Sequence, residues 1–331
     1  MILTVTLNPA LDVTYHVDEY VLGQTHRPRS MSVRAGGKGV NVARVLAGLG
    51  EPVVAAGLAG GATGQSIVDH VRRAGISASF TRIEGESRRT VVVADRDRAT
   101  GVWETGPVVS AAEWATFLDG YPELVRTAGV VVLSGSVPPG LPADTYAQLV
   151  QVAATAGVQV ILDAEGPTLH SGLTAGPTLV KPNADELADA VGAEIDTPER
   201  ALAAAHRLRA GRATVVVASL GHRGLVAATC RRDYAVTPPI PLAGNPTGAG
   251  DALVAALARG LARGTAWPDL LADAVGVAGG AVVAPVAGES RDDVARQITE
   301  RVIVRVVEHD ADHEHDADQG SECDHASCRN S

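Results

Sequence analysis

The sequence predicts an α/β protein in which helices cover both faces of a mostly parallel β-sheet. Short runs of Val, Leu and Ile, such as residues 130–133, are typical of strands that are buried on both faces. From residue 130 onward these runs alternate regularly with segments whose apolar residues recur at helical spacing. Ligands of such sheets bind beyond the carboxyl ends of the strands. The polar segments that follow predicted strands are residues 8–12, 134–139, Asp163, 181–186 and 219–224.

The elements of the first 127 residues are less regular. Residues 2–7 alternate in the manner of a strand and stop at Asn8-Pro9. Short segments around 15–21 and 31–35 indicate small strands outside the main sheet, joined by a loop at 23–29. A helix opens at residues 36–39 and ends at Gly50. The remaining predictions here are strands at 53–58, 78–83 and 90–94 and helices at 63–74 and 111–127.

The second half gives the regular alternation. After the strand at 130–133 we expect a helix at 143–156, a strand at 158–162 and a strand at 178–180. Helices at 184–191 and 198–210 follow, then strands at 214–218 and 224–228. The last predicted elements are helices at 249–263, 267–283 and 291–300.

Composition limits the function classes. The chain has 331 residues, of which 46% are hydrophobic, so it can bury a large core. A net charge of −10 argues against a nucleic-acid-binding protein, which needs a basic surface. No apolar run reaches the roughly 20 residues of a membrane span, and the first residues resemble a strand rather than a signal peptide. These features favour a cytoplasmic protein without a nucleic-acid or membrane partner.

Residues 308–331 form a separate acidic segment without an apolar period, and we expect this tail to be disordered. Its histidines and cysteines leave metal binding open as an alternative, although their spacing matches no tetrahedral motif. These residues are His309, His313, His315, Cys323, His325 and Cys328.

Residues 245–251, Asn-Pro-Thr-Gly-Ala-Gly-Asp, directly precede a long apolar helical pattern. Two glycines let the backbone turn tightly into that helix. The unpaired N–H groups of the first turn and the positive end of the helix dipole together make an anion site. Asp251 lies in the same turn, where a carboxylate can take a proton from an alcohol beside a bound phosphoryl group. The alternative is an ordinary helix start with an acidic first-turn residue.

Six motifs in one order resemble the PfkB (ribokinase-like) family of sugar kinases, within it the branch of 1-phosphofructokinases and tagatose-6-phosphate kinases. The resemblance covers residues 1–307 and implies a doubly wound α/β domain. It also implies a small β-sheet lid, from residues 12–35 and 78–105, that often makes a homodimer contact. The motifs are TLNPALD at 6–12, GGKGVNVA at 36–43, SGSVPPG at 134–140, KPNxxE at 181–186, SLG at 219–221 and NPTGAGD at 245–251.

The resemblance implies a role for each motif residue at the nucleotide end. Asp251 would be the catalytic base, and the backbone of residues 247–250 would bind the phosphoryl group of ATP. The predicted phosphoryl-binding residues are Thr247, Gly248, Ala249 and Gly250. Lys181, Asn183 and Glu186 match the family's nucleotide and Mg²⁺ region, with Asn183 and Glu186 as metal ligands. Ser219, Gly221 and Gly224 match the loop under the ATP phosphates and ribose, and Asp163 is a candidate for a Mg²⁺-bound water.

Two of these assignments have structural alternatives. Asn183 followed three residues later by Glu186 is also a capping-box pattern at a helix start. The segment from Ser219 to Gly224 can equally be an ordinary turn between strands.

At the sugar end, the resemblance implies that Asp12 and Asn41 bind hydroxyl groups. The cations Arg27, Lys38 and Arg88 match positions that bind a phosphate already present on the substrate, with Arg89 as the alternative to Arg88. Three cations around one pocket favour a phosphorylated sugar over a neutral one. The pocket would be completed by Gly37, Gly135 and Ser136. The alternative is that these arginines lie on loops and are solvated without binding a ligand.

The leading functional hypothesis is therefore an ATP- and Mg²⁺-dependent kinase of a ketohexose phosphate. Fructose 1-phosphate is the first choice of substrate, followed by fructose 6-phosphate and tagatose 6-phosphate. The alternatives are a kinase of a neutral sugar or nucleoside, and a sugar-phosphate sensor without catalysis.

Overall fold

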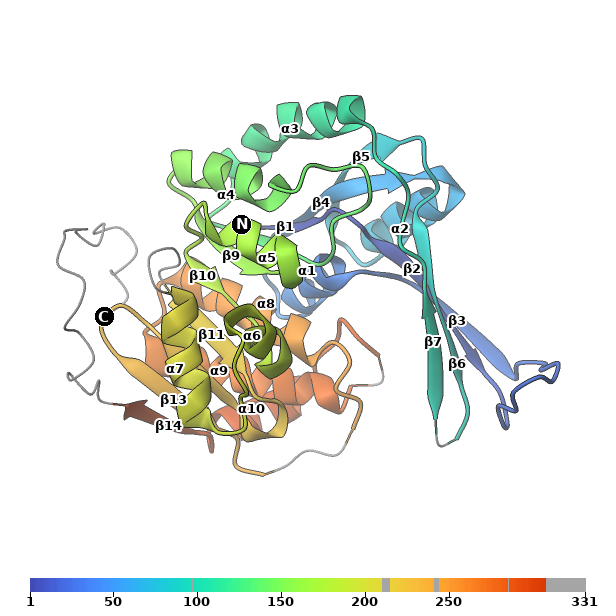
Figure 1. Ribbon diagram of the computed structural model, residues 1–331. Helices are drawn as coiled ribbons and strands as arrows, with labels where there is room; N and C mark the ends of the chain where they lie inside the picture. Colours follow the sequence, from blue (N-terminus) through green and yellow to red (C-terminus); the bar gives the residue numbers. More distant parts are fainter. Residues whose placement is uncertain (97, 210–214, 241–243, 285, 308–331) are drawn as a thin grey trace.

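The computed structural model describes residues 1–96, 98–209, 215–240, 244–284 and 286–307. They form a large α/β body and a narrow sheet that projects from its side (Figure 1). The predicted tail at residues 308–331 lies outside the described residues, together with its candidate metal ligands. None of the helices in the described part combines the length and apolar composition that a bilayer span requires.

The main sheet of the described chain has ten strands in the order β14-β13-β12-β11-β10-β9-β8-β1-β4-β5. The strands from β11 to β5 are parallel to their neighbours, and β12, β13 and β14 are added antiparallel at one edge. The bounds are β1 Ile2–Thr6, β4 Val53–Gly60, β5 Ser77–Ile83, β8 Val130–Ser134, β9 Gln159–Asp163, β10 Leu179–Val180, β11 Val215–Ser219, β12 Leu225–Ala228, β13 Asp233–Thr237 and β14 Ile303–Val307.

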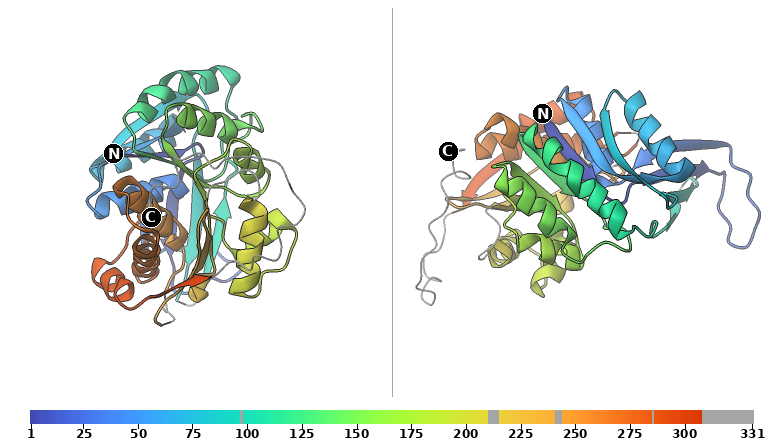
Figure 2. Two further views of the ribbon diagram at one scale, coloured as in Figure 1. Left: turned by 90° about the vertical axis from the view of Figure 1, so that its left-hand side faces the viewer. Right: turned by 90° about the horizontal axis from the view of Figure 1, so that it is seen from above.

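Helices cover both faces of this sheet (Figure 2). Alternate residues of each strand enter opposite cores: Val130 and Val132 lie in one hydrophobic cluster, and Val131 and Leu133 in the other. This pattern confirms the predicted double coverage. On one face lie α1 Lys38–Gly48, α2 Gly61–Arg73, α8 Ala249–Arg263, α9 Trp267–Val282 and α10 Asp292–Thr299. On the other lie α3 Ala111–Arg126, α4 Thr145–Thr155, α5 Gly166–Leu173, α6 Ala184–Val191 and α7 Pro198–Arg209.

The projecting sheet, which we call the lid, has the strand order β3-β2-β6-β7. Its strands are β2 Ala10–His16, β3 Ser30–Gly36, β6 Arg88–Ala94 and β7 Ala99–Trp103. Pro9 separates β1 from β2, because a residue without an N–H cannot continue the ladder of a central strand. The strand predicted around 15–21 therefore begins and ends earlier than expected.

The predicted lid boundary at residue 78 is wrong. Residues 77–83 form β5, which pairs in parallel with β4 at the edge of the main sheet. The helix α2 between them makes the connection a β-α-β crossover, which returns the chain to the same sheet. The sequence reading also missed α5, β7, β13 and β14, which are short elements of five to eight residues.

Candidate active site

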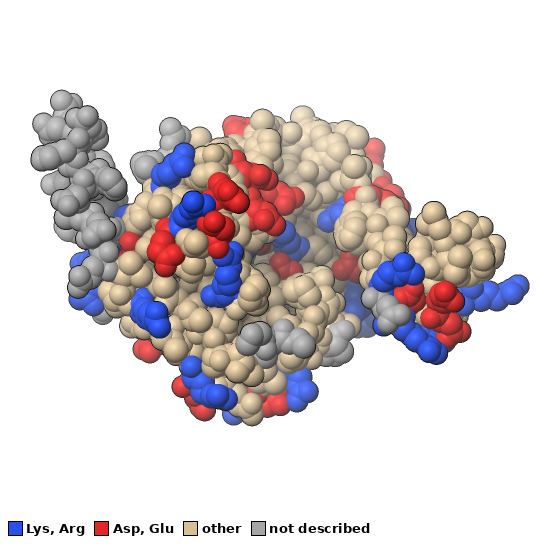
Figure 3. All heavy atoms as spheres, turned by 60° about the horizontal axis from the view of Figure 1, so that its bottom comes forward, with Lys and Arg blue, Asp and Glu red and all other residues tan. Residues whose placement is uncertain are grey.

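A cleft of about 1490 Å³ lies between the lid and the carboxyl ends of the main-sheet strands. Charged side chains of both signs are visible in the hollow between the body and the lid (Figure 3). Most of the predicted site residues line this cleft: Asp12, Gly37, Lys38, Asn41, Arg88, Gly135, Ser136, Asp163, Lys181, Asn183, Glu186, Ser219, Gly221, Gly224, Thr247, Gly248, Ala249, Gly250 and Asp251.

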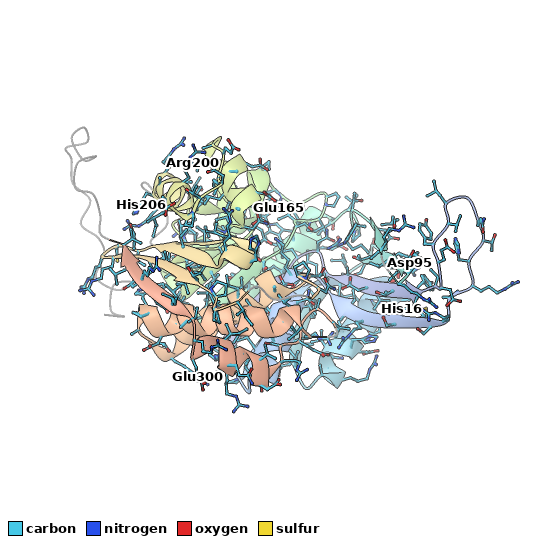
Figure 4. All side chains as sticks on the ribbon, turned by 90° about the horizontal axis from the view of Figure 1, so that it is seen from below. His16, Asp95, Glu165, Arg200, His206 and Glu300 are labelled. Atoms are coloured by element: carbon cyan, nitrogen blue, oxygen red, sulfur yellow. The ribbon has the colours of Figure 1, made fainter. Side chains whose placement is uncertain are left out.

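Arg27 is the exception, because it does not line the cleft of the single chain, and its role at the substrate's phosphate stays a prediction. It is exposed in the loop between β2 and β3. Each of these strands is seven residues long. At about 3.3 Å per residue they carry their connecting loop roughly 20 Å outward. Figure 4 shows His16, the last residue of β2, well out along the lid.

The first turn of α8 has the geometry of an anion cradle. Gly248 is the N-cap with φ +86°, in the left-handed region that favours glycine. A Cβ at Gly248 would lie 2.9 Å from the Cβ of Ala287, so the position also lacks room for a side chain. The amides of Thr247 and Ala249 donate to Asn245 Oδ1 and to the Pro246 carbonyl at 3.0 Å each. The amides of Gly248 and Gly250 are therefore the better candidates for contacting a phosphate.

Asp251 is buried in this turn, with 8% of its surface exposed. Helix α1 packs beside α8, and Asn41 Nδ2 donates to Asp251 Oδ2 at 2.8 Å. Burial, followed by the charge of Asp163, raises the pKa of Asp251 to about 7, although Asn41 and two lysines oppose the shift. A carboxylate with a pKa near neutrality is well matched to proton abstraction from an alcohol.

Beside this turn lies a cluster of lysines and carboxylates from β9, α1, α6 and the segment after β10. Asp163 at the end of β9 is almost fully buried and accepts a hydrogen bond from Ser134 Oγ at 2.9 Å. Its Oδ1 lies 3.3 Å from Lys181 Nζ and 3.7 Å from Lys38 Nζ. Glu186 Oε1 lies 3.5 Å from the same Lys38 Nζ. A Cβ on Gly250 would be 3.8 Å from Lys181 Nζ, so this ammonium group lies beside the cradle.

These groups hold one another in their charged forms. Burial alone would raise the pKa of Asp163, but Lys181 and Lys38 bring it below its usual value. Burial alone would lower the pKa of Lys38, but Asp163 and Glu186 raise it above its usual value. The Lys38 ammonium group therefore lies with the residues predicted for the nucleotide and metal. The sequence analysis assigned Lys38 to the substrate's own phosphate, and that assignment stays a prediction. The two carboxylates beside Lys38 come from distant elements, so a spacing pattern could not reveal them.

Asn183 and Glu186 form a capping box at the start of α6. Asn183 Oδ1 accepts from the Glu186 amide at 2.8 Å, and Glu186 Oε2 accepts from the Asn183 amide at 2.8 Å. The capping box that the sequence offered as the alternative to a metal site is therefore formed. The other Glu186 oxygen faces Lys38 in the cleft. No group of three or more potential ligands among His, Cys, Asp and Glu occurs in the described residues. The Glu186 oxygen that faces Lys38 is the donor here that could reach a Mg²⁺ ion carried by nucleotide phosphates, because hard cations prefer oxygen ligands.

The loop from Ser219 to Gly224 lines the end of the cleft at which the nucleotide is predicted to bind. Ser219 ends β11 and bridges in parallel to Asn183. A single 3₁₀ turn at Gly221–Arg223 then leads into the antiparallel strand β12. Gly224 has φ +94°, and a Cβ there would lie 1.9 Å from the Val236 carbonyl oxygen. The loop is therefore a tight hairpin connection whose backbone is open to the cleft.

At the sugar end, the lid strands present polar groups across the cleft from α1. A Cβ on Gly36 would lie 1.9 Å from Asp12 Oδ2, so the carboxylate lies directly over the glycine backbone. Burial raises the pKa of Asp12, against the effects of Thr90, Arg88 and Arg44. Arg88 Nε donates to the Asn8 carbonyl at 3.1 Å, and Asn8 Nδ2 donates to Ser136 Oγ at 3.1 Å.

The alternation of β6 resolves which arginine faces the cleft. Arg88 lines it, whereas the neighbouring Arg89 points to the other face and donates to Thr63 Oγ1 at 3.3 Å.

Comparison with known proteins identifies the family. Residues 5–293 match the model of the pfkB family of carbohydrate kinases. The chain belongs to the PfkB family. Tagatose-6-phosphate kinase from Staphylococcus epidermidis is 36% identical over 263 residues, which cover 78% of this chain and 85% of that protein. Phosphofructokinase-2 from Escherichia coli in complex with potassium has a TM-score of 0.86 and 28% identity, covering 90% of this chain and 98% of that one. A possible 1-phosphofructokinase from Thermotoga maritima has a TM-score of 0.80 and 26% identity, covering 93% and 99%.

The PfkB fold and an enzymatic role as a carbohydrate kinase are thereby confirmed. The sequence reading nevertheless missed four charged residues of the site. Arg34, Arg44 and Glu165 line the cleft, and Glu289 pairs with both arginines. Glu165 follows β9 and lies beside α5 at the cleft (Figure 4). Arg44 was detectable, because it lies one helical turn after Asn41 on α1.

Proposed function

We propose that this PfkB-family protein transfers the terminal phosphoryl group of ATP to a hydroxyl of a ketohexose phosphate. The product is the sugar bisphosphate, and fructose 1-phosphate, giving fructose 1,6-bisphosphate, is the first choice of substrate. The observation that carries the proposal is Asp251. It is a buried carboxylate with a pKa of about 7, held by Asn41 at the start of α8 and facing the same cleft as Arg88.

In this mechanism the sugar binds under the lid, with Asp12 and Asn41 on its hydroxyl groups. Asp251 takes the proton of the attacking hydroxyl as the phosphoryl group is transferred. The amides of Gly248 and Gly250 face the oxygens on which charge develops, and Lys181 and Lys38 add positive charge there. Because these groups are fixed before substrate arrives, they need little reorganisation in the transition state.

The nucleotide lies along Lys181, Asn183, Ser219, Gly221 and Gly224. Glu186, with Asp163 behind it, is the residue that would hold Mg²⁺. The ion would neutralise charge on the phosphates when bound.

The acceptor's own phosphate is assigned to the lid side of the cleft. Arg88 points into the cleft there, and Ser136 lies nearby, both linked through Asn8. A guanidinium group suits a phosphate dianion because its donors form a planar fork. The relatives named as tagatose-6-phosphate kinase and phosphofructokinase support a phosphorylated sugar over a neutral sugar, a nucleoside or a non-catalytic sensor.

The test is ADP formation measured across fructose 1-phosphate, fructose 6-phosphate, tagatose 6-phosphate, ribose and adenosine. We expect the largest kcat/KM with fructose 1-phosphate. A preference for fructose 6-phosphate or tagatose 6-phosphate would retain the reaction and change the substrate. Turnover of ribose or adenosine alone would refute the assignment of Arg88. The absence of ADP formation with every sugar would support a sensor.

We also propose a homodimer that forms through the lid. Met31, Val102 and Trp103 are more than half exposed on the lid strands, which is unusual for large apolar side chains. Sedimentation of the wild type and of Trp103→Glu tests this proposal, with dimer expected for the first and monomer for the second.

A further inference from the structure

Three charged side chains join the lid to the body at the edge of the cleft. They are Arg34 of β3, Arg44 of α1 and Glu289 of the loop after α9. Arg34 Nη2 lies 2.5 Å from Glu289 Oε1, and Arg44 Nη2 lies 3.7 Å from the same oxygen. Arg44 Nη1 also donates to the Ala35 carbonyl of the lid at 3.4 Å. One carboxylate therefore lies between two guanidinium groups that come from different parts of the fold.

The two guanidinium groups of this cluster are more buried than those of an ordinary surface ion pair. The side chain of Arg44 is 15% exposed and that of Arg34 28% exposed, whereas that of Glu289 is 42% exposed. Burial, and then the charge of Arg34, lower the pKa of Arg44, whereas Glu289 raises it. Without Glu289 the two guanidinium groups would face each other without a shared counterion. The carboxylate thus offsets the repulsion between a guanidinium group of β3 and one of α1.

The loop that carries Glu289 is packed against the catalytic residues. A Cβ at Gly248 would lie 2.9 Å from the Cβ of Ala287, so this loop touches the N-cap of α8. A Cβ at Gly288 would lie 3.3 Å from Asn41 Oδ1, and Asn41 holds Asp251. A shift of the loop would consequently be felt by both the anion cradle and the base.

The other end of the cluster leads to the sugar side. Arg34 is the register partner of Asp12 across β2 and β3. Two residues further along β3 lies Gly36, over which the Asp12 carboxylate is placed. Arg34 therefore lies directly opposite the lid residue assigned to the sugar hydroxyls.

We propose that Glu289 is a positioning residue for phosphoryl transfer. Through Arg34 and Arg44 it holds the lid at the separation from the α8 cradle at which a sugar hydroxyl meets Asp251. This inference rests on the proposed roles of Asp12 and Asp251. It assigns no contact with substrate to Glu289.

The first test is a double-mutant cycle of Glu289→Gln and Arg34→Gln. It uses whichever sugar the wild type phosphorylates. If the two residues act as one unit, each single variant lowers kcat/KM for the sugar by about tenfold. The double variant then loses no more than a single variant, and KM for ATP is unchanged in all three. Independent losses that multiply to about a hundredfold would overturn the proposal, because Arg34 would then act on the substrate by itself. The matched control is Asp293→Asn, which breaks the exposed pair of Asp293 with Arg291 close by and is expected to leave kcat/KM unchanged.

The second test needs no substrate, so it remains decisive if the wild type phosphorylates none of the sugars. Hydrogen exchange is measured in the ligand-free protein on residues 33–37, which form the end of β3 and lead into α1. Exchange several-fold faster in Glu289→Gln than in the wild type and in Asp293→Asn is expected. Equal exchange in all three proteins would overturn the proposal. Equal thermal unfolding midpoints of the variants confirm that the effect is local.

Discussion

Asn41 Nδ2 of α1 donates a hydrogen bond to Asp251 Oδ2 of α8 at 2.8 Å, across 210 positions of the chain. The amide stabilises the ionised form of a carboxylate that burial otherwise keeps protonated. These opposing effects place the pKa of Asp251 at about 7. A small change in the surroundings of Asp251 therefore changes the fraction of the carboxyl that is ionised near neutral pH.

Replacement of Asp251 by Ala is expected to abolish most of the turnover without preventing sugar-phosphate binding. Loss of a general base typically costs about 100-fold to 10,000-fold in rate. Single-turnover phosphoryl transfer and equilibrium binding of the sugar phosphate measure the two effects separately. Unchanged turnover in this variant would remove Asp251 from the mechanism.

The pH profile should report the same group. As the proposed base, Asp251 would act in its ionised form, so log(kcat/KM) is expected to rise with pH up to about 7 and then level off. Asn41→Ala removes a donor that lowers the pKa, and the rise should therefore move to higher pH. The measurement is kcat/KM for the sugar from pH 5.5 to 9. A profile that is flat in the wild type, or that does not move in Asn41→Ala, would contradict the assignment.

The raised pKa of Asp251 also predicts that ionisation of this carboxyl lowers the free energy of unfolding. A carboxyl whose folded-state pKa exceeds its unfolded value contributes stability at low pH, and this contribution is lost as pH rises toward 7. The side chain of Asp251→Asn does not titrate. The free energy of unfolding of this variant, minus that of the wild type, should therefore increase from pH 4 to 7 and stay constant above pH 8. The shift from 3.8 to about 7 sets an upper bound of about 4 kcal/mol on that difference.

Urea unfolding of both proteins at pH 5 and pH 8 measures it, and because all other titrating groups are shared, only the difference between the two proteins matters. A difference that is equal at the two pH values would rule out the linkage.

The sequence was sufficient for the layers of the fold because a strand buried on both faces requires consecutive apolar residues. Val130–Ser134 illustrates this, since neighbouring valines enter opposite cores. The same local pattern does not show to which of the two sheets a strand belongs. Residues 77–83 look like any short strand, and only their pairing with β4 after the α2 crossover assigns them to the body.

The motif residues of the candidate site could likewise be identified from the sequence. The residues that contact them in the folded chain could not. Asp251 and Asn41 belong to recognisable segments, whereas the surroundings of Lys38 come from β9 and α6, more than 120 positions away. Glu289 and Arg34 are 255 positions apart and carry no motif. Charge pairs of this kind depend on tertiary packing, which a single sequence does not specify.

The surroundings of Lys38 suggest a test of which phosphate this lysine contacts. Because its ammonium group lies with Asp163 and Glu186, Lys38→Ala is expected to reduce kcat, with a smaller effect on KM for the sugar. Removal of a group that stabilises developing charge typically costs about 100-fold to 1,000-fold. Steady-state kinetics with each substrate varied in turn separates the two parameters. A rise in sugar KM at constant kcat would support the sequence-based assignment of this lysine to the substrate's phosphate.

The two adjacent arginines of β6 offer a matched pair for the substrate's own phosphate. Arg88 lines the cleft and Arg89 faces Thr63 on the other side, yet both are arginines of one strand. A charge-assisted hydrogen bond contributes about 1.5–3 kcal/mol, so Arg88→Ala should raise KM for the sugar phosphate by about ten- to a hundredfold. Arg89→Ala should leave that KM unchanged, because its side chain cannot reach the cleft without reversing the strand. Inhibition by free inorganic phosphate gives a second measure, and should weaken in the Arg88 variant alone. Equal effects of the two substitutions would show that the strand's net charge, rather than one placed guanidinium group, attracts the substrate.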